Sequence, residues 1–246
     1  MAKEELKKIP EIDLILGINE KNDIAKYIEA AIENNAKKEN PTLQVSEIEK
    51  QKEFLDFGTV TYTEKTRAVI KVQDGCNQFC SYCIIPYARG RIRSRKPQSI
   101  LKEITQISQE GIKEVVITGI HVASYGKDFE KDTILEINQD LQKEKEEYFL
   151  IDLLEDIQNI QGIKRIRLGS LEPTLITEEF VARLAKLDKI CQHFHLSLQS
   201  GCNATLKRMN RKYRVEEFEK VTQLLRSTFP NVNLTTDVIV GFPRRN

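Results

Sequence analysis

The sequence has 246 residues, of which 40% are hydrophobic and 30% charged, and its formal net charge is +1. This composition is typical of a soluble globular protein that can bury a sizeable core. No apolar run approaches the roughly 18–20 residues of a membrane span, and the N-terminus lacks the apolar core of a signal peptide. We therefore expect a cytoplasmic protein whose five cysteines do not form a disulfide framework.

The charge is distributed unevenly along the chain. Residues 1–66 contain ten Lys and Arg against fourteen Asp and Glu, whereas residues 67–100 contain seven against one. The first stretch is acidic and the second strongly basic. Residues 67–100 are therefore predicted to meet an anionic partner.

The N-terminal part of the chain is predicted to be an incomplete unit. Residues 11–35 indicate one strand followed by one amphipathic helix, whose apolar face consists of Ile24, Tyr27, Ile28, Ala31 and Ile32. A single strand and helix cannot bury a core, so residues 1–35 are predicted to be the C-terminal remnant of an N-terminal domain. The polar residues 36–66 are predicted to be a linker.

From about residue 68 onward, short strand-like runs alternate with segments of helical period. The predicted strands are residues 68–75, 114–119, 164–170, 193–198 and 232–241, and the predicted helices are residues 97–111, 148–162, 177–187 and 215–229. Residues 129–147 are expected to be a charged insertion on the surface. This alternation implies parallel strands with crossover helices, hence a doubly wound sheet or a partial TIM-like βα barrel. No sixth strand follows, so the chain is predicted to be an internal piece of a longer protein.

Three closely spaced cysteines lie in the loop after the first of these strands. Cys76, Cys80 and Cys83 have the spacing C-x3-C-x2-C, and three thiolates so placed can converge on zinc or an iron–sulfur cluster. Structural zinc takes four ligands, yet Cys191 and Cys202 lie more than a hundred residues away. A four-iron cluster fits three cysteines, because its fourth iron stays open for a substrate or cofactor. An incomplete zinc site and three incidental buried thiols are the alternatives.

The cysteine spacing, with the aromatic Tyr82 directly before the last cysteine, resembles that of the radical S-adenosylmethionine (SAM) superfamily. The resemblance implies one 4Fe-4S cluster on Cys76, Cys80 and Cys83, with SAM chelated by the open iron. It also implies reductive cleavage of SAM to a 5′-deoxyadenosyl radical that abstracts hydrogen from carbon. The position of the cysteines after the first strand agrees with this resemblance, because the active sites of βα barrels lie at the C-terminal ends of their strands.

Residues at the ends of the other strands are then expected to complete a SAM site, each in a role that stays open. The expected SAM-binding residues are Tyr82, Gly119, Ser170, Glu172, Gln199 and Asp237. Glu172 is expected to meet the ribose hydroxyls or the SAM ammonium. His121, His193 and His195 are expected to be structural, because no third ligand completes a metal site with the two that alternate on one strand.

A run of cations follows the cysteines directly. It consists of Arg89, Arg91, Arg93, Arg95 and Lys96, and an extended backbone would place the four arginines on one face. Arginine suits bidentate contacts with phosphate, so these five residues are predicted to bind RNA backbone close to the cluster. The alternative is a solvated loop that pairs with the protein's own acids.

Five stretches of the chain closely resemble the radical SAM methylthiotransferases. They are "QDGCNQFCSYCIIPYARGRIRSR", "ITGIHVASYG", "LGSLEPTLITEEF", "FHLSLQSGCNATLKRMNRKY" and "TTDVIVGFP". "IIPYARGRIRSR" and "TGIH" are most similar to the members that modify N6-threonylcarbamoyladenosine in tRNA. The resemblance implies insertion of sulfur at position 2 of adenosine-37 beside the anticodon, followed by methylation, with SAM as radical source and methyl donor.

Three alternatives to this substrate stay open. They are methylthiotransfer to N6-isopentenyladenosine in tRNA, methylthiotransfer to a ribosomal protein, and an inactive RNA-binding fragment with a structural cluster. For each hypothesis with a tRNA substrate, the expected partner is the anticodon stem-loop, and an electron donor of unknown identity is needed.

The resemblance also implies parts that the sequence does not contain. The family has an N-terminal domain whose three cysteines hold a second 4Fe-4S cluster, and a C-terminal RNA-binding TRAM domain. Here we expect residues 1–35 to be the end of that first domain, 36–66 a linker, and 67–246 a radical SAM core truncated after its fifth strand. The TRAM domain is predicted to be absent. The chain alone is therefore not expected to complete methylthiolation.

Overall fold

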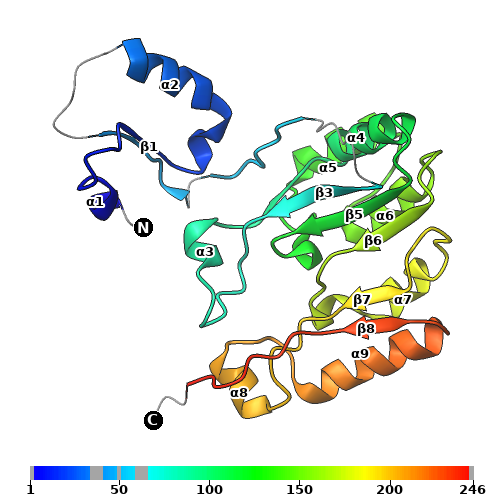
Figure 1. Ribbon diagram of the computed structural model, residues 1–246. Helices are drawn as coiled ribbons and strands as arrows, with labels where there is room; N and C mark the ends of the chain where they lie inside the picture. Colours follow the sequence, from blue (N-terminus) through cyan, green and yellow to red (C-terminus); the bar gives the residue numbers. More distant parts are fainter. Residues whose placement is uncertain (1–2, 34–40, 49–50, 59–65, 244–246) are drawn as a thin grey trace.

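A computed structural model describes residues 3–33, 41–48, 51–58 and 66–243 of the chain. It contains a small N-terminal unit and a larger α/β part (Figure 1). None of the helices within these ranges is long and apolar enough to cross a membrane.

The N-terminal unit contains a strand pair that the sequence did not predict. Its elements are α1 (Lys3–Leu6), β1 (Leu14–Leu16), the 3-10 helix η1 (Asn19–Asp23), α2 (Ile24–Glu33) and β2 (Thr42–Gln44). β2 pairs in parallel with β1, with Leu14 opposite Thr42. The expectation of a linker throughout residues 36–66 is therefore wrong at β2, although the threefold division of the chain stays a prediction. The predicted helix residues 34–35 lie outside the described residues.

The larger part is built on a mainly parallel sheet. Its strands are β3 (Arg67–Asp74), β4 (Arg93–Ser94), β5 (Glu114–Gly119), β6 (Arg165–Leu168), β7 (His193–His195) and β8 (Asn233–Thr235). β4 pairs antiparallel with β3, while β3, β5 and β6 are parallel in the order β4-β3-β5-β6. β7 and β8 form a second parallel pair, and bridges between Ile166 and Ile190 and between Leu171 and Leu196 continue the sheet toward it. The predicted partial βα fold is confirmed.

Helices cover one face of this sheet (Figure 1). They are α4 (Pro97–Gln109), α5 (Lys131–Leu141), α6 (Leu150–Gln158), α7 (Glu178–Leu184) and α9 (Val215–Thr228). Alternation along β3 turns Ala68, Ile70 and Val72 toward the helices, and all three are at most 1% exposed. Val69 lies on the opposite face and is 53% exposed. The sheet therefore has one fully packed face, with its other face turned away from the helices.

Two expectations about the elements need correction. Residues 129–147 are not a simple surface insertion, because α5 buries Ile134 and Ile137 in the core. The last strand is shorter than the predicted residues 232–241, so Asp237 follows β8 rather than lying within it. Hydrophobic spacing located the elements, but the outward charges of α5 masked its two inward isoleucines.

The short helices α3 (Ile85–Ala88) and α8 (Asn203–Arg208) lie beyond the carboxyl ends of the strands (Figure 1). Two 3-10 turns, η3 (Val122–Ser124) and η4 (Pro173–Leu175), follow β5 and β6 at the same edge. The loops that carry the cysteines and most of the candidate site residues therefore meet at one edge of the sheet.

Candidate functional site

The cysteine loop starts at the end of β3 and is closed at its base. Gly75 has a φ of +70°, and a Cβ atom on it would lie 1.8 Å from the Arg91 carbonyl oxygen. Only glycine fits this position, because both the left-handed backbone and the close approach exclude a side chain. The Cys76 amide donates to the Gly90 carbonyl at 3.1 Å. Residues 76–90 thus form a loop whose two ends touch.

The three thiols of this loop suit a metal cluster. All are free; Cys76 and Cys80 are buried and Cys83 is half-buried. Burial raises the pKa of Cys76, and the nearby Cys80, Cys83 and Glu172 charges raise it further, although the Gln78 amide opposes them. A thiolate here needs a cation to compensate its charge, which a metal centre supplies.

The donor type of this loop can be compared with that of the predicted cluster. Cysteine thiolates are the ligands that hold 4Fe-4S clusters in proteins. The donor set therefore fits the predicted 4Fe-4S cluster on Cys76, Cys80 and Cys83 in its chemistry. Within the described ranges, no group of three or more His, Cys, Asp or Glu side chains is placed to hold a single metal ion.

A buried glutamine connects the cysteine loop to the end of the neighbouring strand. The Gln73 amide nitrogen donates to the carbonyls of Asp74 (2.6 Å) and Gly75 (2.7 Å), and its oxygen accepts from the His121 amide at 2.7 Å. The predicted site residue Gly119 packs directly against it, since a Cβ atom there would lie 2.9 Å from the Gln73 carbonyl oxygen. Gln73 is fully buried, and it fixes where β5 ends relative to the loop.

Glu172 is the centre of the polar network at this edge. Its carboxylate accepts from Gln78 at 2.9 Å, lies 2.9 Å from the His121 Nε2 atom, and pairs with Arg211 at 3.3 Å. Burial alone would raise its pKa, but the hydrogen bond and charge of His121 and the charge of Arg211 hold the pKa below its ordinary value. Glu172 thus remains an anion beside the cysteine loop, although it is only 3% exposed.

Arg211 joins this carboxylate to the cysteines. Its Nη1 atom donates to the Cys80 sulfur at 3.3 Å, and its Nε atom donates to the Tyr213 hydroxyl at 3.3 Å. The Tyr213 hydroxyl in turn donates to the Leu198 carbonyl at 2.7 Å, just beyond β7. Arg211 therefore places a positive charge on one thiol of the loop while being held by groups from two other strand ends.

Of the remaining predicted SAM-binding residues, Tyr82 lies beside Cys80 and Arg211 of this network, whereas Gln199 and Asp237 contact each other instead. The Gln199 amide donates to the Asp237 carbonyl at 3.0 Å, so these two are neighbours, and the Asp237 side chain lies 3.3 Å from the His195 Nε2 atom. Ser170 is exposed. Tyr82 packs edge-on against Phe242 at 6.2 Å between ring centroids. The structure thus brings Gly119 and Glu172 to the cysteine loop and gathers Gln199 and Asp237 further along the same edge.

The four arginines after the cysteines do not all lie on one face, as an extended backbone would have placed them. Arg93 is 1% exposed and lies 3.6 Å from Asp74, which also receives two hydrogen bonds from Arg89. Arg95 is 5% exposed and pairs with Asp56 and Glu103. The prediction that all five cations face RNA is therefore wrong for Arg93 and Arg95, because the pairing of β4 with β3 holds this stretch against the protein's own acids.

Arg91 and Lys96 stay on the surface, whereas Arg89 is half-buried against Asp74. Arg91 is exposed and stacks over the Phe79 ring at 4.6 Å, and Lys96 is exposed and pairs with Glu136. Contact of Arg89, Arg91 or Lys96 with RNA stays a prediction.

Several residues of the site were missed from the sequence. Gln73, Gln78 and Arg211 were not singled out, and His121 was assigned only a structural role. His121 could have been found, because it lies two residues beyond the strand end that directed attention to Gly119. Arg211 gave no such signal, since it lies more than a hundred residues from the thiol that it contacts.

Fold and site together define an α/β enzyme class with a three-cysteine loop after its first core strand. Residues 70–246 match the family description "Radical SAM superfamily". The chain belongs to this superfamily, of which an iron–sulfur cluster and SAM are characteristic.

The chain is also similar to curated proteins of two different names. The chain is 38% identical over 97% of its length to a threonylcarbamoyladenosine tRNA methylthiotransferase from Bacillus subtilis, and covers 49% of that protein. It is 39% identical over 98% of its length to a protein of the same name from Aquifex aeolicus, covering 53% of it. Identity to a tRNA-2-methylthio-N(6)-dimethylallyladenosine synthase from Clostridium botulinum is 35% over 99% of the chain and 49% of that protein. The chain thus spans about half the length of the curated relatives it matches.

Proposed function

We propose that this chain is the radical SAM portion of a tRNA methylthiotransferase that acts at position 2 of N6-threonylcarbamoyladenosine at position 37, beside the anticodon. The observation that carries the proposal is the similarity of almost the whole chain, 97% of it, to a relative of that name. The closed cysteine loop agrees with it, because it supplies three cluster ligands and leaves one iron open for SAM.

Within this proposal the residues of the network have separate tasks. Cys76, Cys80 and Cys83 hold the cluster, which together with SAM supplies the hydrogen-abstracting radical when both are bound. Arg211 donates a hydrogen bond to Cys80 and so stabilises the thiolate form. Glu172 fixes the orientation of Arg211 and presents a buried negative charge toward the loop, which suits a cationic group of SAM.

A second candidate substrate is N6-dimethylallyladenosine, also called N6-isopentenyladenosine. It is favoured by 35% identity over 99% of the chain to a relative named for that nucleoside. The two substrates differ in the polarity of the N6 group, which is a carboxylate-bearing threonylcarbamoyl group in one case and an apolar prenyl group in the other.

Nucleoside analysis distinguishes these substrates. We expect that deleting the gene for this protein removes 2-methylthio-N6-threonylcarbamoyladenosine from total tRNA, measured by mass spectrometry, and that the intact gene restores it. Loss of the methylthiolated isopentenyladenosine instead would assign the second substrate. If both methylthiolated nucleosides persist in the deletion strain, the tRNA proposal is wrong.

Reconstitution tests the cluster directly. Anaerobic incubation of the chain with iron and sulfide should give broad visible absorption and slow, dithionite-dependent release of 5′-deoxyadenosine from SAM. Cys80→Ala should abolish both, because one of three ligands is lost. Cys202→Ala is the matched control and should change neither, since Cys202 is exposed on α8's flank and outside the loop. A cluster without SAM cleavage would indicate an RNA-binding fragment with a structural cluster, and stoichiometric zinc without colour a zinc module.

A further inference from the structure

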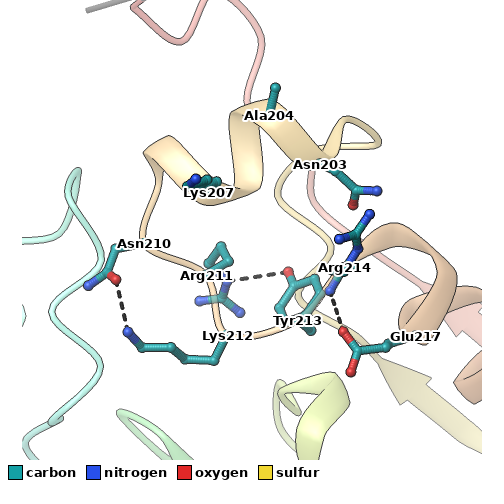
Figure 2. A pocket seen from close by; sticks show the side chains of 9 residues that line it. All are labelled: Asn203, Ala204, Lys207, Asn210, Arg211, Lys212, Tyr213, Arg214 and Glu217. Carbon is teal, nitrogen blue, oxygen red and sulfur yellow. Dashed lines mark hydrogen bonds between the residues drawn. The ribbon is translucent and has the colours of Figure 1, made fainter.

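A cavity opens between α8 and the start of α9, next to the cysteine loop. Its volume is about 520 Å³, and Figure 2 shows it bordered by Asn203 and Lys207 from α8, by Asn210 and Lys212 from the connecting loop, and by Arg214 ahead of α9. Positive side chains and neutral amides dominate this lining. The only acid among its lining residues is Glu217, which accepts a hydrogen bond from the Arg214 amide at 2.7 Å. The cavity is therefore built for an anion.

Two of the four cations that line this cavity form no ion pair with the protein's own acids within the described residues. Within the described residues, Lys207 and Lys212 form no ion pair, and the Lys212 ammonium donates only to the Asn210 side-chain oxygen at 2.8 Å. Arg214 pairs with Glu216 at 3.3 Å, but both side chains are at least 60% exposed. A pair this exposed contributes little and exchanges readily with a stronger anion. Arg211 is excluded as a ligand, because Cys80, Glu172 and Tyr213 occupy its guanidinium.

The cavity is fastened to the cysteine loop by four hydrogen bonds. Asn210 donates to the carbonyls of Gln78 (3.3 Å) and Phe79 (2.9 Å). Ser81 donates through its amide to the Met209 carbonyl at 3.1 Å and through its hydroxyl to the Arg208 carbonyl at 2.8 Å. A ligand held in this cavity is therefore fixed relative to the cysteines.

We propose that this cavity binds phosphodiester groups of the RNA substrate, with Lys207, Lys212 and Arg214 as its cationic ligands. The inference rests on the proposed function, because it takes RNA as the substrate. Phosphodiesters are the anions that RNA presents in every sequence, and lysine binds them as a point charge. RNA gripped here lies beside the loop at which the radical is generated.

The α8–α9 cavity takes the place of much of the RNA binding predicted for residues 89–96. Arg93 and Arg95 are buried against carboxylates there, and Lys96 is paired with Glu136. A phosphate could reach those two arginines only by breaking buried ion pairs, which is costly. Lys207 and Lys212, which form no ion pair in the described part of the chain, are available without such a loss.

The test compares two triple variants of the full chain that remove the same charge. The first, Lys207→Gln/Lys212→Gln/Arg214→Gln, neutralises the cavity. The second, Lys186→Gln/Lys220→Gln/Arg226→Gln, neutralises exposed cations of α9 and the end of α7 away from the cavity. Binding of a fluorescently labelled anticodon stem-loop RNA is measured by anisotropy between about 50 and 200 mM salt. Thermal unfolding followed by circular dichroism checks that each variant folds.

We expect the cavity variant to bind more weakly and to lower the slope of log affinity against log salt by about 0.7–0.9 for each phosphate that the protein no longer neutralises. The control variant should keep the slope of the unmodified chain. Lys207→Gln alone should lower the slope by about 0.7–0.9, the value for a single phosphate, and it serves if the triple variant unfolds. Equal slopes for both triple variants would overturn the cavity assignment while leaving the tRNA proposal intact. Absence of any salt-dependent binding by the unmodified chain would also overturn the cavity assignment, whereas the nucleoside analysis of the deletion strain tests the tRNA proposal separately.

Discussion

Two cation-rich segments border the cysteine loop, and the protein uses them differently. Residues 89–96 follow the loop and hold five cations, of which Arg93 and Arg95 are buried against carboxylates. Residues 207–214 also hold five cations, and Lys207 and Lys212 have no carboxylate partner in the described residues. The first segment therefore uses two of its arginines to stabilise the fold around the loop, while the second keeps two lysines that we propose for a ligand. Charge density in a sequence does not measure charge that is free to bind.

The test with the largest expected effect removes Asp74, the acid that both Arg89 and Arg93 contact. Asp74→Ala should lower the free energy of unfolding by about 3–5 kcal/mol, because it leaves Arg93 buried without its carboxylate. Burial already lowers the pKa of Arg93, so the residue depends on this partner. Urea denaturation measures the loss. A decrease below about 1 kcal/mol, the size expected for a surface ion pair, would mean that the first segment is not structural.

The second test concerns the one cation of residues 207–214 that behaves like the first segment. Arg211→Gln should lower the free energy of unfolding by about 3 kcal/mol, because Glu172 remains buried without its arginine partner. It should also reduce the iron bound after reconstitution, since Cys80 loses its donor. Lys212→Gln, one residue away and exposed, is the matched control and should preserve both values. Equal iron content in the two variants would show that Arg211 does not contribute to iron binding at the cysteine loop.

The smallest expected effect is a change in acid sensitivity at Asp56. Burial alone would raise its pKa, but hydrogen bonds from Ser99, Arg95 and the Gly58 amide hold the folded-state pKa below the ordinary value of 3.8. Such a carboxylate adds stability at pH above its unfolded pKa and loses it as pH falls through the folded pKa. Asp56→Asn should therefore make the unfolding free energy fall less steeply below about pH 4. Denaturant titrations at several pH values measure the slope, and an unchanged slope would contradict the prediction.

Much of the fold was accessible from local sequence pattern, whereas the site was accessible only in part. The strand at residues 114–119 was located to the residue, and the helix predicted to start at residue 177 does begin there, where the Thr177 hydroxyl caps α7 by accepting from the Phe180 amide at 3.1 Å. Both features depend on neighbours within a few residues. The cysteine loop was also found, because its spacing is contained in eight residues.

The errors arose where partners lie far apart along the chain. Arg95 finds Asp56 and Glu103 at separations of 39 and 8 residues, and Arg211 finds Cys80 at a separation of 131. No periodicity in the sequence reports such pairings. Whether an arginine faces inward was decided by the tertiary structure, and α8 was too short for its period to be visible.

The closed base of the cysteine loop has a consequence for assembly of the metal centre. Ordering a free backbone costs about 1–2 kcal/mol per residue in conformational entropy. A flexible loop would lose that entropy when it binds iron. Here the close approach of Gly75 to Arg91 and the hydrogen bond from Cys76 to Gly90 restrict the loop before any ligand arrives. The chain thus meets this entropic cost during folding, and more of the free energy of ligation remains to hold the cluster.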